Sequence, residues 1–132
     1  MTTESKKKIL IVDDEPDIRN FLSACIEDAG FLVDTARDGI EALDVFRQHQ
    51  AEIRCVLTDL TMPRLDGWGL LTALRQLDPN LPVILASGYD KAQVLAGTQP
   101  DRPQAFLSKP YDLQQLQDAV DQALMTRSGA EL

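Results

Sequence analysis

Five polar residues stand where short apolar runs of this sequence end. Two neighbouring carboxylates follow the first run, a third follows a later run, and a hydroxyl and an ammonium group follow two more: Asp13, Asp14, Asp59, Ser87 and Lys109. Taken singly, each has an ordinary explanation, because Asp and Ser at the end of a strand often cap the next helix and a lone Lys is usually solvated. Three carboxylates brought together, however, repel one another and raise one another's pKa unless a cation shares the site. If these residues converge, something positive must bind there.

The ligand types available favour Mg²⁺ as that ion. Carboxylate oxygens with room for water match the near-octahedral coordination of Mg²⁺, which commonly also takes phosphate oxygens, and Mn²⁺ can substitute for it. Residues that prefer softer metals are not placed to compete. His49 is expected to be solvated late in a helix, and Cys25 and Cys55 lack a metal-binding spacing and are expected to be small buried residues.

A carboxylate held beside Mg²⁺ and an ammonium group can act as a nucleophile. Asp59, with Lys109 nearby, can attack a phosphoryl donor and form an acyl phosphate. Phosphoryl transfer mainly requires alignment and neutralisation of the equatorial oxygens, which Mg²⁺, Lys109 and the Ser87 hydroxyl would supply. Each hydrogen bond to a charged group contributes roughly 1.5–3 kcal/mol, which is enough to shift a loop between two states. One site would thus serve both chemistry and switching.

These residues converge only if the chain forms one parallel sheet, and the alternation of apolar runs with amphipathic segments predicts such a sheet. The predicted strands are 8–12, 31–35, 53–58, 82–86 and 105–108. The predicted helices run from Pro16 to Gly30, from Gly39 to about His49, through Leu70, Leu71 and Leu74 after a turn at 63–67, more weakly from about Asp90 to Ala96, and from Leu113 to Met125. Right-handed βαβ crossovers place helices on both faces of such a sheet. The sequence therefore predicts an α/β fold, a doubly wound (βα)5 sandwich, with ligands at the carboxyl edge of its sheet.

The 132 residues suit a single domain, 1–132, with a core from about residue 8 to 127 and no output domain. The formal net charge of −8 argues against direct nucleic-acid binding. Lys6, Lys7 and Lys8 are interpreted as a solvated lead-in to the first strand. No run approaches the roughly 18 apolar residues of a membrane span, and the polar start lacks the apolar segment of a signal peptide. We therefore expect no membrane insertion and a cytoplasmic location.

Four segments resemble the signature segments of response-regulator receiver domains, the CheY-like domains of two-component and phosphorelay signalling. They are ILIVDDEPDIRNFL, VLTDLTMPRLDGWGLL, PVILASGYD and AFLSKPYDL, in that order between Ile9 and Leu113. The resemblance implies a flavodoxin-like three-layer sandwich with a parallel sheet of order 2-1-3-4-5. It also implies a signalling switch that a histidine kinase or a histidine phosphotransfer protein phosphorylates on Asp59. Such a switch is no enzyme beyond catalysing its own phosphorylation and dephosphorylation.

The resemblance also implies how the acidic residues and their neighbours divide the work. Asp59 would accept the phosphoryl group, and Asp14 would bind Mg²⁺ directly. Asp13 would hold the ion mainly through water, with Asp59 and the backbone carbonyl of Thr61 as further ligands. Thr61 and Tyr89 match the two family positions that gate the attacking water. A bulky Tyr89 is expected to slow the loss of phosphate.

Other implied roles concern the response to phosphorylation. Ser87 matches the switch hydroxyl, Lys109 the phosphoryl-binding lysine, and the bond from Lys109 to Pro110 is expected to be cis. Phe106 matches the aromatic residue that turns inward when the hydroxyl moves, the alternative being a plain core aromatic. One segment departs from the family: 97–104, with prolines at 100 and 103, cannot be helical throughout and is predicted as a loop that shortens the fourth helix. This leaves open whether the face of the fourth helix, fifth strand and fifth helix signals in the usual way.

Two other functions remain as alternatives. A haloacid-dehalogenase-like phosphatase also uses an Asp nucleophile, Mg²⁺, a hydroxyl and a Lys, but it needs a second Asp two residues after the nucleophile, where Thr61 stands. A receiver-like interaction module would work without phosphorylation, although all five site residues are present. A nucleotide-binding role is disfavoured, because no glycine-rich phosphate loop follows any predicted strand. The cognate kinase, the downstream protein, a phosphorylation-linked dimer and attachment to a hybrid sensor kinase stay open.

Overall fold

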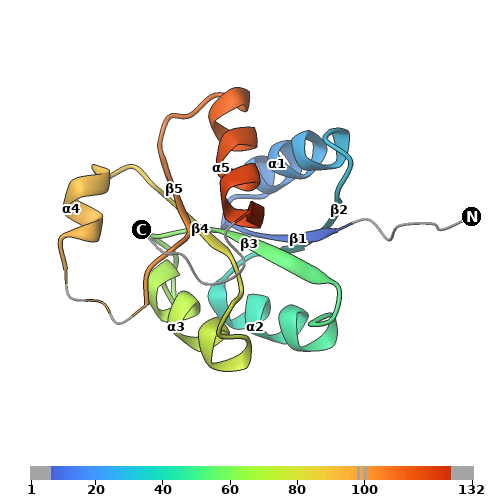
Figure 1. Ribbon diagram of the computed structural model, residues 1–132, viewed down its shortest axis with the longest axis horizontal. Coiled ribbons are helices and arrows are strands. Elements are labelled where there is room, and N and C mark those ends of the chain that lie inside the picture. The colour runs from blue at the N-terminus through green and yellow to red at the C-terminus, as the bar shows by residue number, and fades with distance from the viewer. Residues whose placement is uncertain (1–6, 98, 100, 126–132) are drawn as a thin grey trace, which may run out of the picture.

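The computed structural model of the chain describes residues 7–97, 99 and 101–125. Strands and helices alternate along it as β1 (Lys8–Val12), α1 (Pro16–Asp28), β2 (Leu32–Ala36), α2 (Gly39–Gln48), β3 (Ile53–Asp59), α3 (Gly67–Leu77), β4 (Val83–Ser87), α4 (Lys91–Leu95), β5 (Ala105–Ser108) and α5 (Leu113–Met125). The strands form one parallel sheet of order β2-β1-β3-β4-β5. α1 and α5 cover one face and α2 and α3 cover the other, which makes three layers (Figure 1). The predicted fold class and strand order are confirmed.

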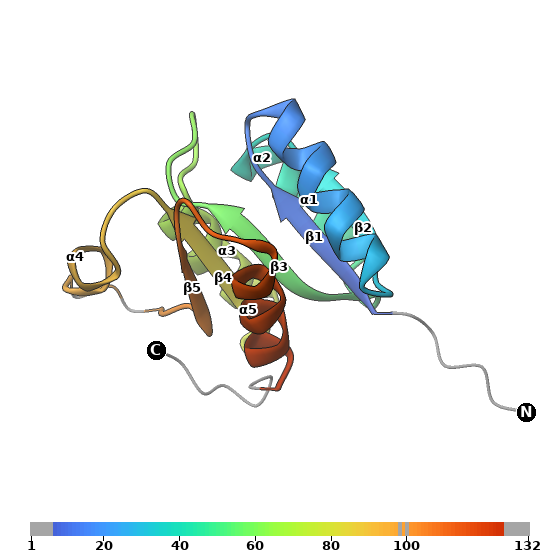
Figure 2. The ribbon, with the colours of Figure 1, turned by 90° about the horizontal axis from the view of Figure 1, so that it is seen from above.

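The register of the sheet brings the carboxyl ends of the strands to one edge. The last residue pairs of the four ladders are Val12 with Ala36, Val12 with Thr58, Asp59 with Ala86, and Ser87 with Ser108. Seen from above, α1 lies over β1 and β2, and α5 lies over β3, β4 and β5 (Figure 2). The helices therefore cover the sheet and leave its carboxyl edge to the loops.

Apolar side chains of the central strands alternate between two cores. Ile9 and Ile11 belong to the cluster under α1 and α5, whereas Leu10 and Val12 belong to the cluster under α2 and α3. Burying one such side chain stabilises the fold by about 1.5–3 kcal/mol. Because each long helix buries only one face, its other face is polar. Within the described residues, no helix has the length and hydropathy that crossing a bilayer requires.

Gly30 ends α1 and delays the start of β2. Its φ of 100° is left-handed. The amides of Gly30 and Phe31 donate to the carbonyls of Glu27 at 3.0 Å and Ile26 at 3.3 Å, which is the pattern of a Schellman C-cap. Phe31 therefore belongs to the cap, and β2 begins at Leu32, one residue later than predicted.

Three strands of the sheet, β2, β3 and β4, end one residue further toward its carboxyl edge than the sequence pattern predicted. β3 ends at Asp59 and β4 at Ser87, so the sheet itself holds these two residues. β4 also begins one residue later than predicted, because Pro82 has no amide to donate to the ladder. The Pro82 carbonyl accepts a bond from the Val56 amide at 3.0 Å instead.

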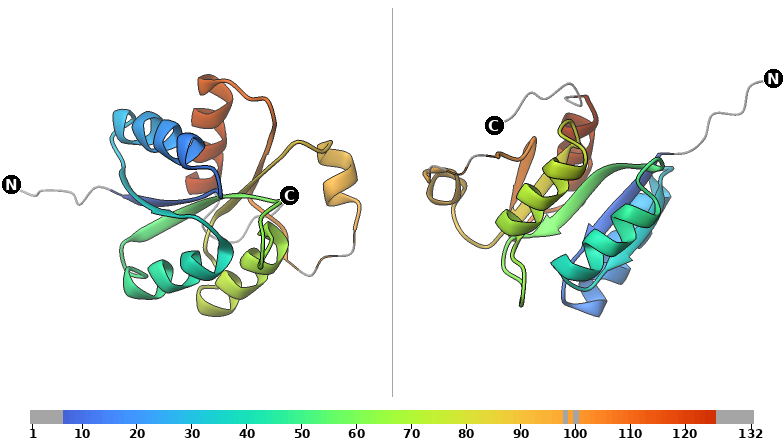
Figure 3. Two further views of the ribbon diagram at one scale, coloured as in Figure 1. Left: turned by 180° about the vertical axis from the view of Figure 1, so that it is seen from behind. Right: turned by 90° about the horizontal axis from the view of Figure 1, so that it is seen from below.

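α4 is a short helix that stands beside β5, apart from the layers (Figure 3). None of its residues is buried. The Arg102 guanidinium donates to the carbonyls of Leu95 and Gly97, the second at 3.0 Å, and so binds the end of this helix. The described residues of 97–104 form no helix or strand, as predicted.

The basic residues at the start of the chain differ from the predicted solvated lead-in. Lys8 is only partly solvated, because its side chain is 14% exposed and its ammonium lies 3.3 Å from carboxylate oxygens of both Asp34 and Glu52. Opposite charges held this close between neighbouring strands stabilise the pairing of β1 with β2 and β3. Lys7 is exposed, and Lys6 lies outside the described residues.

The residues considered for softer metals lie apart from the carboxyl edge of the sheet or within its core. His49 follows α2 as its C-cap, is partly exposed, and has Nδ1 3.1 Å from Glu52 Oε2. Cys55 is fully buried, which raises the pKa of its thiol to about 12. Cys25 is only half-buried, in contrast to the expected full burial.

Candidate functional site

Three of the five polar residues singled out in the sequence form an acidic cluster at the carboxyl edge of the sheet. Asp13 and Asp14 begin the β1–α1 loop, and Asp59 ends the neighbouring strand β3. Each offers a carboxylate oxygen, and these oxygens lie within 4.8 Å of one another. The order of the strands thus joins residues that are more than forty positions apart in the sequence.

Lys109 brings an ammonium group to this cluster from the other side. Its Nζ donates to Asp59 Oδ1 at 3.0 Å, with the Asp59 side chain 11% exposed and the Lys109 side chain 35% exposed. The Lys109 amide donates to the carbonyl of Ser87 at 2.8 Å, which fixes the backbone from which the side chain reaches back. The peptide bond from Lys109 to Pro110 is cis.

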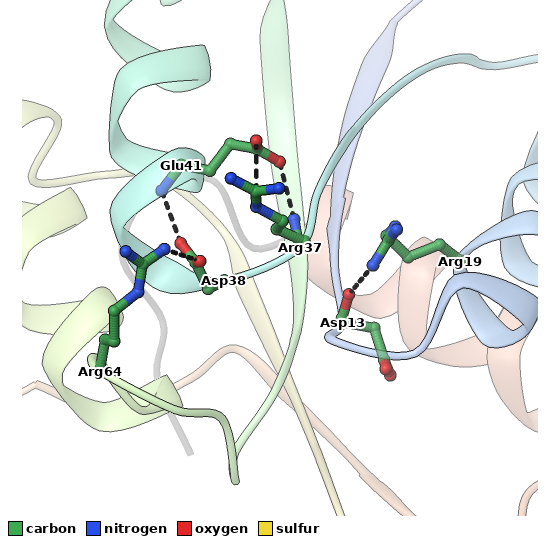
Figure 4. A network of polar contacts seen from close by, with 6 residues as sticks. All are labelled: Asp13, Arg19, Arg37, Asp38, Glu41 and Arg64. Carbon is green, nitrogen blue, oxygen red and sulfur yellow. Dashed lines mark hydrogen bonds and ion pairs between the residues drawn. The ribbon is translucent and has the colours of Figure 1, made fainter.

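Asp13 is the most constrained of the three carboxylates. Its amide donates to the Ala36 carbonyl at 3.1 Å, its carbonyl accepts from Arg19 Nη1 at 2.7 Å, and its Oδ1 accepts from the Glu15 amide at 2.9 Å. Figure 4 shows the Arg19 side chain reaching back to Asp13. Burial raises the pKa of Asp13, and the charge of Asp59 adds to this rise against the opposing effect of the Glu15 amide. Burial destabilises the ionised form of this carboxylate, and a nearby cation would stabilise it.

The charge balance of the cluster fits a divalent cation with oxygen ligands. Lys109 neutralises the charge of one carboxylate, and the charge of the other two remains. Hard oxygens at this spacing, one on the exposed Asp14 and one on the buried Asp13, suit an ion that keeps part of its water shell. The residues present therefore fit Mg²⁺.

Ser87 lies beside this cluster in a defined turn. It is buried, and its Oγ accepts a bond from the Tyr89 amide at 3.0 Å. Asp90, and not Ser87, occupies the N-cap position of α4. The hydroxyl therefore organises the turn after β4 and does not cap the helix. Tyr89 is 64% exposed.

The remaining residues that the resemblance named lie near the same edge. Phe106 is half-buried on β5, opposite Leu85 of β4, and lies outside both clusters of core residues. Thr61 is exposed in the loop between β3 and α3. The amide of its neighbour Leu60 donates to the Ala86 carbonyl at 2.8 Å, which extends the sheet pairing almost to Thr61.

The loop between β3 and α3 is closed by short-range contacts. The Gly67 amide donates to the Leu60 carbonyl at 2.8 Å, and Asp66 caps α3 by accepting from the Gly69 amide at 2.8 Å. A Cβ at Gly67 would lie 2.8 Å from the Leu60 Cα, so only glycine allows this closure. Arg64, at the tip, has a left-handed φ of 70° and pairs with Asp38 (Figure 4).

Sequence reasoning missed Arg19, the Asp38–Arg64 pair and Tyr111. Burial raises the pKa of Tyr111 to about 12, with the negative charges of Asp13 and Asp59 adding to the rise. Tyr111 packs against the core cluster under α1 and α5 and stays protonated at neutral pH. Aspartate is a preferred N-cap residue, so its position directly before the predicted helix start at Gly39 could have suggested the role of Asp38 at α2. Nothing local in the sequence joins Asp38 to Arg64.

Comparison with known proteins gives a family match over most of the chain. Residues 9–121 match the family model of the response regulator receiver domain. The chain is 33% identical over 116 residues to the sensor kinase CckA of Brucella abortus, covering 88% of this chain and 12% of that protein. It is 30% identical over 122 residues to sporulation initiation phosphotransferase F of Bacillus subtilis, covering 92% of this chain and 97% of that protein. The matched region is thus a small part of one relative and nearly the whole of the other.

Solved structures agree with this match. The chain superposes on the CheX–CheY–BeF3–Mg²⁺ complex from Borrelia burgdorferi with a TM-score of 0.78 and 32% identity, covering 86% of each chain. With the family model, the near full-length relative and the fold in agreement, the chain belongs to the response regulator receiver domains, the phosphorylation-dependent switches of two-component signalling.

Proposed function

We propose that Asp59 receives a phosphoryl group from a phosphohistidine donor in a Mg²⁺-dependent reaction. The observation that carries this proposal is the position of Asp59, which lies within 4.8 Å of Asp13 and Asp14 and 3.0 Å from the Lys109 ammonium. A carboxylate in that setting is both shielded from bulk water and flanked by the charges that phosphoryl transfer needs.

Four oxygen donors of the chain are proposed to hold the ion. Asp14 and Asp59 bind it directly, Asp13 binds it mainly through water, and the Thr61 carbonyl completes the protein ligands, with Mn²⁺ able to substitute. The close spacing of the three carboxylates supports this set. When bound, Mg²⁺ supplies positive charge that neutralises the phosphoryl oxygens. The chain's part is to fix the carboxylates, as the three backbone and side-chain bonds of Asp13 do.

In the transfer itself, an Asp59 carboxylate oxygen attacks phosphorus. The new O–P bond forms as the N–P bond of the phosphohistidine breaks, and the imidazole nitrogen leaves with the bonding electrons. Lys109 moves its hydrogen bond from the carboxylate to a phosphoryl oxygen. The proposed reaction modifies the chain itself and is not the turnover of a free substrate.

The signal is proposed to arise when the Ser87 side chain rotates toward the phosphoryl group and gives up its present bond to the Tyr89 amide. Its Oγ now accepts from the Tyr89 amide. When the hydroxyl turns to donate to a phosphoryl oxygen, the turn after β4 rearranges and half-buried Phe106 moves inward. A hydrogen bond to a charged phosphoryl oxygen contributes roughly 1.5–3 kcal/mol, enough to exchange two loop states.

The donor is proposed to be a histidine kinase or a histidine phosphotransfer protein. Two relatives support this class of partner, because one is named as a sensor kinase and the other as a phosphotransferase. The signal then passes by protein contact or by onward phosphotransfer, and a phosphorylation-linked dimer stays a prediction. A haloacid-dehalogenase-like phosphatase gains no support, because Thr61 stands where that class needs its second Asp and the family match is to receivers.

The decisive experiment is incubation with acetyl phosphate and MgCl2, followed by intact mass spectrometry. The parent should gain the mass of one phosphoryl group, and excess EDTA should prevent this. Asp59→Asn should gain none, whereas Asp66→Asn, which changes a helix cap outside the cluster, should label like the parent. A parent without an adduct, or equal labelling of Asp59→Asn, would refute the proposal and favour an interaction module that works without phosphorylation.

A further inference from the structure

The loop between β3 and α3 is tied to the start of α2 by an ion pair between distant residues. Asp38 Oδ1 caps α2 by accepting from the Glu41 amide at 2.8 Å, and Asp38 Oδ2 accepts from the Arg64 guanidinium (Figure 4). The Asp38 side chain is 6% exposed and that of Arg64 is 59% exposed. The Glu41 amide and then Arg64 hold the pKa of Asp38 below its ordinary value. One carboxylate thus serves a helix and a loop at once.

Apolar packing ties the same loop at neighbouring points. A Cβ at Gly39 would lie 2.9 Å from the Leu65 side chain, so Leu65 packs directly on the backbone at the start of α2. Met62 is 8% exposed and belongs to the core cluster under α2 and α3. The loop is therefore anchored at Met62, Arg64 and Leu65. Thr61, just before the first anchor, and Pro63, between the first two, are exposed.

Thr61 takes its backbone orientation from these anchors. On one side of it, Leu60 is fixed by its bonds to Ala86 and Gly67, both 2.8 Å. On the other side, the chain must reach Arg64, whose left-handed φ of 70° is unfavourable for an L-residue. Such a conformation persists when surrounding contacts over-determine it. The Leu65 amide donates to the Pro63 carbonyl at 2.8 Å across Arg64, and the Arg64 side chain pairs with Asp38.

We propose that the Asp38–Arg64 ion pair positions the β3–α3 loop so that the Thr61 carbonyl can bind Mg²⁺. Asp38 and Arg64 are then positioning residues of the metal site, although neither touches the ion. This inference rests on the proposed function, because the Thr61 carbonyl is a metal ligand only in the Mg²⁺ site proposed above.

Electrostatics alone predicts the opposite effect for one substitution, which makes the proposal testable. Removing the Arg64 charge leaves the acidic cluster more negative, and this should tighten Mg²⁺ binding if Arg64 acts only through space. If Arg64 positions the loop, its removal should weaken binding. The sign of the change therefore decides between the two explanations.

The experiment is a titration of each folded protein with MgCl2 at constant ionic strength, followed by NMR of backbone amides. Arg64→Met removes the charge and keeps the aliphatic stem, and Asp38→Asn keeps the helix cap while losing the ion pair. Both should weaken Mg²⁺ binding by about three- to fivefold, the size expected for a partly exposed ion pair. Arg64→Lys should restore most of the affinity, and the double variant should be no weaker than either single one.

Arg47→Met is the matched control, because it removes the same charge at the opposite end of α2. Arg47 is 57% exposed and pairs only loosely with Asp44, at 3.7 Å within one helical turn. It should bind Mg²⁺ as the parent does or slightly more tightly. Thermal unfolding of each variant separates general destabilisation, which leaves the affinity of the folded protein unchanged, from the positioning effect.

The outcomes separate this inference from the function on which it rests. If the parent binds Mg²⁺ and Arg64→Met binds it equally or more tightly, the positioning role is overturned while the metal site stands. If the parent binds no Mg²⁺, the metal site of the proposed function fails, and the positioning role fails with it. Weaker binding by Arg64→Met with recovery in Arg64→Lys supports the positioning role.

Discussion

At the scale of single residues, the three carboxylates of the acidic cluster are held in different ways. Asp59 is fixed by its bond to Lys109, and Asp13 has one oxygen occupied by the Glu15 amide. Asp14 is exposed and free to meet a hydrated ion. These differences match the proposed division into phosphoacceptor, water-mediated ligand and direct ligand.

Tyr89 gives a prediction at this scale. Its amide is bonded to Ser87, and the residue is 64% exposed. We predict that its ring shields an acyl phosphate on Asp59. Tyr89→Ala should therefore lose phosphate several-fold faster than the parent. The measurement is the decay of the phosphorylated mass after the acetyl phosphate is removed.

Tyr89→Phe is the control for that experiment, because it keeps the bulk of the ring and loses only the hydroxyl. Its decay rate should stay close to that of the parent. Equal or slower loss of phosphate in Tyr89→Ala would contradict a shielding role for the ring.

At the scale of elements, the end of α1 gives a prediction about backbone conformation. Gly30 has a φ of 100°, and a Cβ there would meet nothing within 4 Å. Any cost of Gly30→Ala must then come from the left-handed backbone, which costs an L-residue about 1–2 kcal/mol. The free energy of unfolding, measured by urea titration, should fall by about that amount.

Gly88 is the matched control, because a Cβ at this position also meets nothing within 4 Å and its φ is not left-handed. Gly88→Ala should be neutral or stabilise the fold by about 0.4–1 kcal/mol through a less free unfolded chain. A similar loss of stability in both variants would argue against the conformational explanation.

The elements themselves were largely predictable from the sequence. β1, β5 and α5 have the predicted bounds, because apolar periodicity fixes them locally. The starts of β2 and β4 were each predicted one residue early, because the Schellman cap at Gly30 and the missing amide of Pro82 act through hydrogen bonds that periodicity does not reveal. The residues of the acidic cluster were also predictable, since parallel strands bring their carboxyl ends to one edge.

At the scale of the whole molecule, contacts between distant segments could not be predicted. Lys8 was expected in solvent, yet it pairs with Asp34 and Glu52. The ion pair of Asp38 with Arg64 likewise joins two loops that only the folded sheet brings together. Such pairs depend on which charged side chains the tertiary fold brings together. The local sequence around a charged residue does not select one oppositely charged partner among the many in the chain.

The acidic cluster also links the site to the stability of the entire domain. Burial raises the pKa of Asp13 above its ordinary value of 3.8 in the folded chain, so the folded state binds a proton there more readily than the unfolded state. Ionised Asp13 therefore lowers the free energy of unfolding above the folded pKa. This cost vanishes below pH 3.8, where the residue is protonated in both states.

Asp13→Asn should accordingly be more stable than the parent at neutral pH without Mg²⁺, by about 1 kcal/mol. Asparagine can still accept from the Glu15 amide, so the turn should survive. Urea unfolding at a series of pH values should show that the stability advantage of Asp13→Asn shrinks as pH falls toward 3.8. At neutral pH, MgCl2 should also shrink it, because the cation binds and stabilises the parent with all three carboxylates more than the variant with two. An advantage that persists unchanged in acid and in Mg²⁺ would mean that packing, and not the buried negative charge, limits stability at this position.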